Sequence, residues 1–338
     1  MMDAYLYQRL GNGKVRCDLC SHRCVIKDGK RGICGVRENQ KGELKSLVYG
    51  RLIAQHVDPI EKKPLFHVLP GTLSFSIATV GCNFRCRFCQ NADIAQLPAD
   101  REGMIMGESY TPEDVVAAAL RADCRSIAYT YTEPTVFFEF AFDTAKLAHE
   151  KGLVNVFVTN GYMTSEALYM IQPYLDAANV DLKAFNDDFY KNQCAARRKH
   201  VMESLKLMKE LGIFLEVTTL LIPGLNDDKK ELEQLASFIV NDLGCETPWH
   251  ISRFHPTYRL TDRSPTPVET IHQAREIGLN AGLRYVYCGN VPGDEGENTT
   301  CYSCGHALIR RWGFHISENN ITNNKCPQCG VYIDGIGL

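Results

Sequence analysis

The sequence lacks features that would suit it to membranes or to nucleic acid. No run of about 18 apolar residues occurs in its 338 residues, which excludes a membrane-spanning helix of that kind. The net charge of −3 and pI of about 6.4 disfavour a protein built to grip a nucleic acid backbone. Residues 1–17 contain no apolar core after a basic start, so we expect no secretory signal and a cytoplasmic protein.

Two nucleotide-binding motifs are also missing, since neither GxGxxG nor a P-loop occurs, and this weakens a dehydrogenase or kinase interpretation. Cysteine, in contrast, is abundant, with 15 residues in the chain. In a reducing cytoplasm, cysteines in tight CxxC spacing typically bind metal rather than form disulfides. Eleven fall in three compact groups, and the others are interpreted as small buried apolar residues: Cys124, Cys194, Cys245 and Cys288.

Predicted strands alternate with predicted helices through the middle of the chain. The β-rich segments are residues 72–79, 125–130, 153–159, 178–182, 213–221, 249–254 and 283–288. The helical segments are residues 111–123, 134–151, 165–175, 200–211, 227–243 and 267–281. This alternation predicts right-handed βαβ units around a parallel sheet. We therefore expect an α/β fold, and a partial (β/α)6 TIM-type barrel rather than a flat doubly wound sheet.

Polar motifs follow the ends of six predicted strands. They lie at residues 81–90, 131–134, 160–162, 181–185, 223–226 and 254–256. Barrel enzymes place their active sites at the carboxyl ends of the strands, so these motifs predict an active site at that rim.

The loop after the first predicted barrel strand reads TVGCNFRCRFCQN and has the spacing C-x3-C-x2-C. Three thiolates, from Cys82, Cys86 and Cys89, can hold three corners of a [4Fe–4S] cluster. A fourth local cysteine is missing, which leaves one iron open for another ligand and indicates chemistry at that iron. The alternative is a structural zinc site with a distant fourth ligand.

This loop resembles the radical S-adenosylmethionine (SAM) signature CxxxCxΦC, with Phe88 as the aromatic residue. The resemblance implies that SAM chelates the open iron and is cleaved reductively to a 5′-deoxyadenosyl radical that abstracts hydrogen from a substrate. It also implies that the partial barrel is of the radical SAM kind, and that backbone near Phe88 contacts SAM.

Further motifs resemble pyruvate formate-lyase activating enzymes. Tyr131–Pro134 (YTEP) is similar to their GGEP-like segment, with Glu133 and Pro134 matching and Thr132 replacing glycine. TNGY at 159–162 and DLK at 181–183 resemble their segments after the third and fourth strands, although Val158 replaces an acidic residue. The resemblance implies SAM contacts from Phe88, Thr132, Glu133, Asn160, Asp181, Lys183 and His255. The alternatives are a helix-start carboxylate at Glu133, a surface pair of Asp181 with Lys183, and an ordinary loop histidine at His255.

Two further cysteine groups flank the predicted barrel. The first has the spacing C-x2-C-x3-C-x9-C and consists of Cys17, Cys20, Cys24 and Cys34. The second has the zinc-ribbon-like spacing C-x2-C-x21-C-x2-C and consists of Cys301, Cys304, Cys326 and Cys329. Thiolate count does not choose between zinc, a single iron and a second iron–sulfur cluster, so we predict metal at both groups without naming it. His22 could replace one thiolate of the first group, although a surface histidine is the simpler interpretation.

Residues 56–72 (HVDPIEKKPLFHVLPGT) lie between the first cysteine group and the barrel. They are either a solvated connecting loop or a cover for the barrel mouth that supplies substrate contacts. Three parts are expected: residues 1–71 as a cysteine-rich segment and connection, 72–290 as the barrel, and 291–338 as a metal-binding knuckle.

The order of these motifs resembles the AmmeMemoRadiSam system radical SAM enzymes over nearly the whole chain. That resemblance implies two accessory protein families as functional partners and, for a radical SAM enzyme, a one-electron donor of flavodoxin or ferredoxin type. It supplies no substrate. A glycyl-radical activase acting on a partner protein is the second enzyme hypothesis. A multi-cluster electron carrier and a zinc-ribbon nucleic-acid binder are the alternatives outside enzymes.

Overall fold

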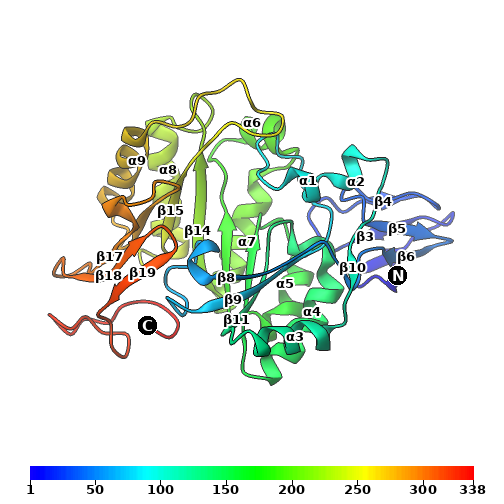
Figure 1. Ribbon diagram of the computed structural model, residues 1–338. Helices are drawn as coiled ribbons and strands as arrows, with labels where there is room; N and C mark the ends of the chain where they lie inside the picture. The colour runs from blue at the N-terminus through cyan, green and yellow to red at the C-terminus, as the bar shows by residue number, and fades with distance from the viewer.

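The computed structural model describes residues 1–338 and is organised around one eight-stranded sheet (Figure 1). The strand order is β16-β15-β14-β13-β12-β11-β9-β8. Seven of these strands run parallel, namely β9 (Leu73–Ala78), β11 (Ser126–Tyr129), β12 (Val154–Thr159), β13 (Ala177–Asp181), β14 (Phe214–Leu221), β15 (Trp249–Arg253) and β16 (Val286–Gly289). The last strand, β8 (Ala54–Pro59), pairs antiparallel to β9 at one edge.

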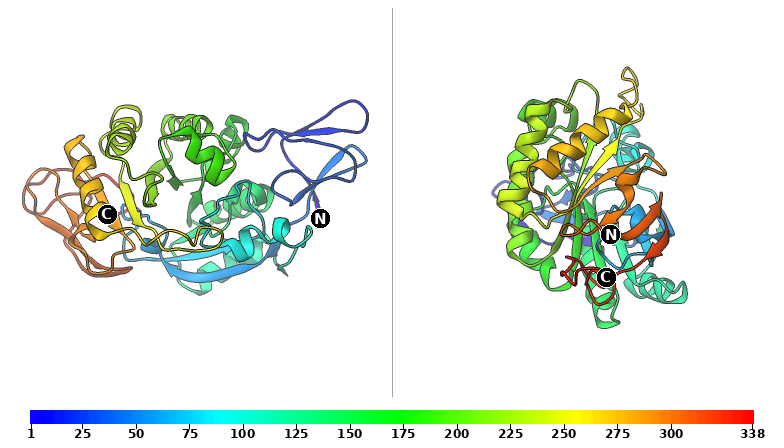
Figure 2. Two further views of the ribbon diagram at one scale, coloured as in Figure 1. Left: turned by 90° about the horizontal axis from the view of Figure 1, so that it is seen from above. Right: turned by 90° about the vertical axis from the view of Figure 1, so that its left-hand side faces the viewer.

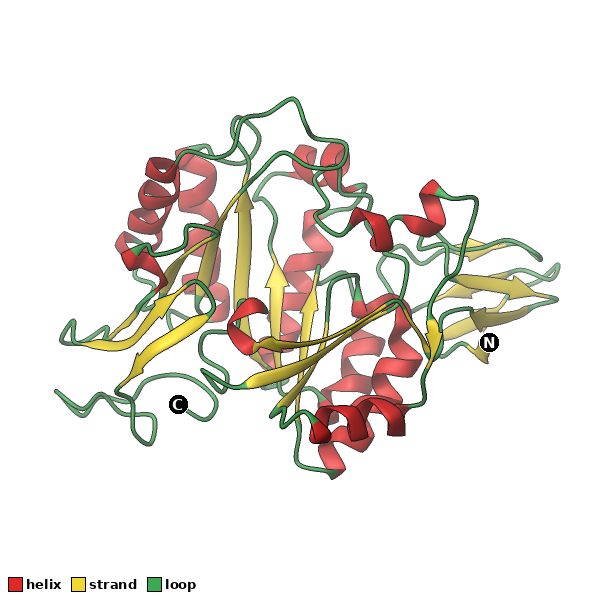
Figure 3. Cartoon of the chain, viewed as in Figure 1, coloured by secondary structure: helices red, strands yellow, loops and turns green.

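Helices follow the parallel strands and cover the outer face of the curved sheet (Figures 2 and 3). They are α3 (Pro112–Arg121), α4 (Phe138–Glu150), α5 (Ser165–Ile171), α7 (Arg198–Glu210), α8 (Lys229–Phe238) and α9 (Val268–Asn280). Thr111 begins α3 with a capping box, in which its hydroxyl accepts a hydrogen bond from the Asp114 amide and the Asp114 carboxylate accepts one from the Thr111 amide. The predicted partial (β/α)6 barrel is therefore confirmed, with β16 as a seventh parallel strand.

The seven parallel strands are largely buried on both faces, as expected between a helical layer and a barrel interior. One apolar core of 67 residues extends through the barrel and into the N-terminal segment. Short helices α1 (Ala92–Ala95) and α2 (Leu97–Asp100) follow the central cysteine loop, and α6 (Asp187–Phe189) follows β13. None of the helices is long and apolar enough to cross a membrane.

Small sheets lie at the two ends of the barrel (Figures 1 and 2). The N-terminal end holds two three-stranded sheets: β1 (Met2–Asp3), β6 (Glu43–Ser46) and β5 (Arg37–Gln40) form one, and β2 (Tyr7–Arg9), β3 (Val15–Cys17) and β4 (Val25–Ile26) form the other. β7 (Arg51–Leu52) pairs with β10 (Glu108–Ser109) beside them. The C-terminal end is an antiparallel ribbon of β17 (Thr299–Thr300), β18 (Ala307–Trp312) and β19 (His315–Asn319).

Part of residues 56–72, which were predicted to form either a connecting loop or a cover, is regular structure. Residues 54–59 form β8, and Ile60–Lys62 form one 3-10 turn. β8 is an edge strand that ends at Pro59, a position where a missing amide donor costs the sheet nothing. It is short, and its burial runs against its polarity, since Asp58 is buried and Val57 is exposed, so no apolar period of two marks it in the sequence.

Candidate active site

A large cavity opens at the carboxyl ends of the barrel strands. It is lined by the central cysteine loop and by residues that follow several strands. All three loop cysteines, Cys82, Cys86 and Cys89, reach it. Of the seven residues predicted to contact SAM, six line it as well: Phe88, Thr132, Glu133, Asn160, Asp181 and Lys183.

The central cysteine loop is held by its own backbone and by the segment after α6. The Arg85 amide donates to the Cys194 carbonyl over 2.9 Å, and the Arg87 amide donates to the Gln193 carbonyl over 3.0 Å. Near Cys82, the Phe84 amide lies 3.3 Å from the sulfur. An N–H group directed at sulfur favours the thiolate form, so this contact favours a thiolate at Cys82.

The thiols of this loop suit a cluster better than a single zinc ion. The three sulfur atoms do not all lie within 4.8 Å of one another, whereas the sulfur atoms around one tetrahedral zinc ion are about 3.8 Å apart. Burial raises the pKa of Cys82 well above its ordinary value and raises that of Cys89 to about 12. Such thiols become thiolates only beside a strong positive charge, which either a zinc ion or the iron ions of a cluster would supply, so the choice between them rests on the spacing of the sulfurs. The donor set therefore fits a [4Fe–4S] cluster with one open iron.

Glu133 is the best-buried carboxylate of the cavity and is 1% exposed. One oxygen accepts from the Thr135 amide at 3.0 Å and from the Thr159 hydroxyl at 2.7 Å, and the other accepts from the Asn160 amide at 2.8 Å. Burial raises its pKa. These bonds tie the loop after β11 to the end of β12, and they fix the position of Asn160, whose side-chain amide lies 3.8 Å from the Cys82 sulfur.

A charged pair follows β13. The Lys183 ammonium donates to Asp181 over 2.8 Å and lies 5.7 Å from the centre of the Phe88 ring. Burial alone would lower the pKa of Lys183, but Asp181 and nearby thiols outweigh it and raise that pKa well above its ordinary value. The pair is thus fixed against the cysteine loop rather than free on the surface.

The segment after β8 forms part of the same cavity, because Lys62, Lys63 and Pro64 line it. Lys63 is 1% exposed and donates to Asp58 over 2.6 Å, while Lys62 donates to the other oxygen of Asp58 over 2.8 Å. The Tyr131 hydroxyl also donates to Asp58. Of the two hypotheses for residues 56–72, this placement supports the cover over the barrel mouth.

His255 is placed differently from the other predicted SAM contacts. It is exposed on the loop after β15 and does not line the cavity. At that side of the cavity stand Ser252, Asn290 and, from the C-terminal ribbon, Phe314. No sequence motif predicted Phe314, because its place depends on how the ribbon packs on the barrel.

The N-terminal cysteines line a second, smaller and largely apolar cavity. Cys17, Cys20, Cys24 and Cys34 all border it, and no three of their sulfurs lie within 4.8 Å of one another. His22 borders it too, and its Nε2 lies 2.8 Å from the Asn83 carbonyl oxygen, a hydrogen bond that leaves the lone pair on Nδ1. The cavity thus presents four thiols and one imidazole.

The C-terminal cysteines form a much tighter group. All four sulfurs lie within 4.8 Å of one another, with Cys301 and Cys329 3.6 Å apart and Cys304 and Cys326 3.7 Å apart. A tetrahedral ion with bonds of about 2.3 Å requires sulfurs about 3.8 Å apart, so this group fits zinc or a single iron.

Of the isolated cysteines, Cys124, Cys194 and Cys288 are buried and Cys245 is partly buried. Cys194 lies beside the central loop, through its carbonyl bond to Arg85. Cys288 lies with His272 and Asp294, all three ligand atoms within 4.8 Å of one another. No motif in the sequence predicted this trio, because its members share no recognisable ligand spacing.

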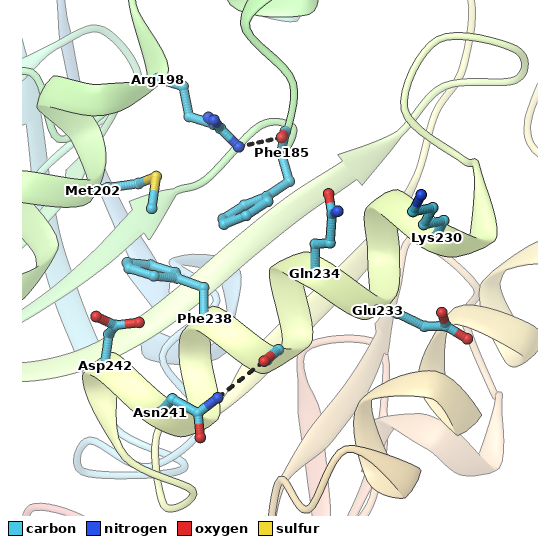
Figure 4. Close-up of a pocket in the computed structure, with 10 residues that line it drawn as sticks. Phe185, Arg198, Met202, Lys230, Glu233, Gln234, Phe238, Asn241 and Asp242 are labelled. Atoms are coloured by element: carbon cyan, nitrogen blue, oxygen red, sulfur yellow. Dashed lines mark hydrogen bonds between the residues drawn. The ribbon is translucent and has the colours of Figure 1, made fainter.

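A separate pocket lies on the helical side between α7 and α8 (Figure 4). Phe185 and Phe238 form its floor, and the Arg198 guanidinium lies 4.5 Å from the Phe185 ring centre. It contains no cysteine and none of the predicted site residues.

Comparison with known proteins agrees with the geometry of the cysteine loop. The family model described as the Radical SAM superfamily matches residues 76–239. Protein MJ0808 of Methanocaldococcus jannaschii, itself uncharacterised, is 48% identical over 336 residues, which is 99% of each chain. The pyruvate formate-lyase-activating enzyme of Clostridium pasteurianum is 26% identical over 180 residues, covering 50% of this chain and 72% of that enzyme.

Among solved structures, Streptococcus suis SuiB bound to S-adenosylmethionine has a similar fold. The TM-score is 0.52 at 12% sequence identity, covering 68% of this chain and 53% of that one. At this identity the likeness concerns the fold alone.

Proposed function

We propose that this chain, which carries a radical SAM domain and is related to pyruvate formate-lyase activating enzymes, cleaves SAM reductively and removes a hydrogen atom from a substrate. Cys82, Cys86 and Cys89 would hold the catalytic [4Fe–4S] cluster. When bound, that cluster supplies SAM with one electron and so generates the 5′-deoxyadenosyl radical. The observation that carries the proposal is the convergence of these three thiols with six predicted SAM contacts on one cavity.

The chain's own residues have distinct roles in this proposal. Asn160 and the backbone near Phe88 bind SAM, and Glu133 positions Asn160 through its amide. Asp181 and Lys183 line the SAM side, and Lys183 adds positive charge next to Phe88. His255 would reach SAM only after a movement of its loop, since its side chain is exposed. The mouth formed by Lys62, Lys63 and Phe314 faces the substrate and excludes water from the radical.

The setting of the reaction follows from the same proposal. We place the enzyme in the cytoplasm, with a flavodoxin- or ferredoxin-type protein as its one-electron donor. Its accessory partners would be the two protein families of the AmmeMemoRadiSam system, which the order of motifs resembles. Residues 1–71, 72–290 and 291–338 would act as an N-terminal metal segment, the catalytic barrel and a C-terminal knuckle.

A glycyl-radical activase is the second candidate. It is favoured by the relationship to the Clostridium pasteurianum activating enzyme and by the TNGY and DLK segments, which end at the cavity. In that case the hydrogen would come from a glycine of a partner protein.

The test is anaerobic. The protein is reconstituted with iron and sulfide, SAM and dithionite are added, and 5′-deoxyadenosine is quantified. We expect product from the wild type and none from Cys86→Ala, with Cys124→Ala as the control because Cys124 is buried outside the cavity. Cleavage by Cys86→Ala would overturn the proposal. A glycyl radical appearing on a partner by electron paramagnetic resonance (EPR) would select the activase.

A further inference from the structure

We propose that the N-terminal cysteines hold a second [4Fe–4S] cluster, and that this cluster passes electrons to the catalytic one. The site is defined by Cys17, Cys20, Cys24 and Cys34. The electron-transfer part rests on the proposed function, whereas the assignment of the cluster does not.

The spacing of the sulfurs separates the two flanking groups chemically. The C-terminal sulfurs are at the separation of one tetrahedral ion, with pairs 3.6 Å and 3.7 Å apart. The N-terminal sulfurs are spread so that no three lie within 4.8 Å, although all four border one cavity. A cubane places its four irons at separate corners, so its thiolates stand further apart than those around a single ion. The N-terminal group therefore matches the larger centre.

Arg37 supplies an independent observation that points to an anionic occupant. It borders the same cavity, is 2% exposed, and has two guanidinium nitrogens, Nε and Nη1, without a hydrogen-bond partner in the chain. Its third nitrogen, Nη2, donates to the Tyr5 carbonyl over 2.7 Å and pairs with Glu139 at 2.9 Å. Unpartnered buried N–H groups are costly, and sulfide and thiolate sulfurs of a negatively charged cluster would accept from them.

The loops that carry the two cysteine groups pack directly against each other. A Cβ built on Gly81, the residue before Cys82, would meet the Cys34 carbonyl oxygen at 3.2 Å and the Val36 side chain at 2.6 Å. Glycine at position 81 therefore allows the catalytic loop to pack on the N-terminal loop. His22 adds a hydrogen bond to the Asn83 carbonyl, on the other side of Cys82. The two cavities also share a wall, since Glu133 borders one and Thr135 the other.

The N-terminal site also lies near the surface, where a donor can bind. Ile33 borders its cavity and is 45% exposed. A reduced flavodoxin- or ferredoxin-type donor would give up one electron to the N-terminal cluster. That cluster would then be reoxidised by passing the same electron to the catalytic cluster, so each centre changes by one electron.

The first arm of the test removes the catalytic site and leaves the N-terminal thiols intact. The Cys82/Cys86/Cys89 triple alanine variant is reconstituted with iron and sulfide and analysed for iron, sulfide and zinc. We expect about four irons and four sulfides per chain from the N-terminal cubane, with an EPR signal after reduction, against about eight of each in the wild type, besides one zinc or iron at the C-terminal group in both proteins. Binding of zinc without sulfide in this variant would overturn the cluster assignment, whether or not the wild type cleaves SAM.

The second arm tests the path of the electron with Cys20→Ala/Cys34→Ala. We expect this variant to contain about four fewer irons per chain. It should still form 5′-deoxyadenosine with dithionite, but the rate of 5′-deoxyadenosine formation with a reduced flavodoxin should fall at least tenfold. Retained cleavage with dithionite shows that the barrel is folded and that the proposed function holds. Equal rates with flavodoxin in variant and wild type would overturn the relay.

Discussion

At the scale of single residues, the chain order of the motifs places most of the predicted site residues around one cavity, because parallel strands bring their carboxyl ends to one rim. Asn160 and Asp181 come from neighbouring strands, so the topology alone places them side by side. What a side chain does there depends on packing, which the motifs do not encode. Glu133 is fully occupied by internal hydrogen bonds, and His255 turns outward.

Glu133→Gln should weaken SAM binding without unfolding the barrel. Glutamine keeps the shape but has only one acceptor oxygen, so either the Asn160 amide or the Thr159 and Thr135 donors lose their partner. A hydrogen bond to a charged group contributes about 1.5–3 kcal/mol, which predicts a Kd for SAM at least tenfold higher. Titration calorimetry measures it, with Glu150→Gln on the exposed end of α4 as control. An unchanged Kd would contradict the positioning role of Glu133.

Lys63 should make the free energy of unfolding depend on pH in the alkaline range. Burial lowers its pKa to about 8, below the usual 10.5, even though Asp58 opposes that shift. Between these two values the unfolded chain binds more protons at Lys63 than the folded chain, so this lysine's contribution to the free energy of unfolding rises with pH. Denaturant unfolding from pH 7 to 10 should show the wild type gaining stability relative to Lys63→Met. Parallel curves for the two proteins would contradict this assignment.

At the scale of elements, amphipathic periods and caps predicted the barrel helices and strands to within a few residues. The prediction failed where elements are short. The strands β1 to β7 have two to four residues each, too few for a period to emerge, and they depend on one another for pairing. The sequence patterns also did not predict contacts between distant elements, such as the buried network around Glu216.

Glu216 of β14 joins three parts of the fold from inside the barrel. Its carboxylate lies 2.6 Å from His250 Nε2 on β15, and it accepts from the amides of Phe66 and His67 at 3.1 Å and 2.8 Å. His67 in turn bonds the Tyr287 hydroxyl of β16 at 2.6 Å. This network holds the segment after β8 in the barrel.

Glu216→Ala should therefore destabilise the protein by about 3–5 kcal/mol, since it leaves buried partners without their anion. Thermal and urea unfolding followed by circular dichroism measure the loss. Glu203→Ala is the matched control, because Glu203 is exposed on α7 and its removal should cost less than about 0.5 kcal/mol. Equal stabilities of the two variants would show that the network contributes nothing.

At the scale of the whole molecule, the barrel carries a cysteine-rich segment at each end (Figure 2), and the two differ in how they reach the active site. The N-terminal group contacts the catalytic loop directly through Gly81. The C-terminal group has a small core of its own, with Cys301 and Cys326 packed beside Leu308 and Ile333, and it docks on Tyr285 and Tyr287. Its ribbon then brings Phe314 to the cavity.

Cys326→Ala should consequently lower the stability of the fold more than it lowers SAM cleavage. A segment this small depends on its metal, and loss of a structural metal destabilises by on the order of 4 kcal/mol, which lowers Tm by roughly 8 °C or more. The cysteines of the catalytic loop are untouched, so 5′-deoxyadenosine formation with dithionite should persist below the new Tm. Calorimetry and metal analysis measure the first effect, with Cys245→Ala as the control outside every cysteine group. A variant with unchanged Tm and no cleavage would instead place the C-terminal metal in the reaction itself.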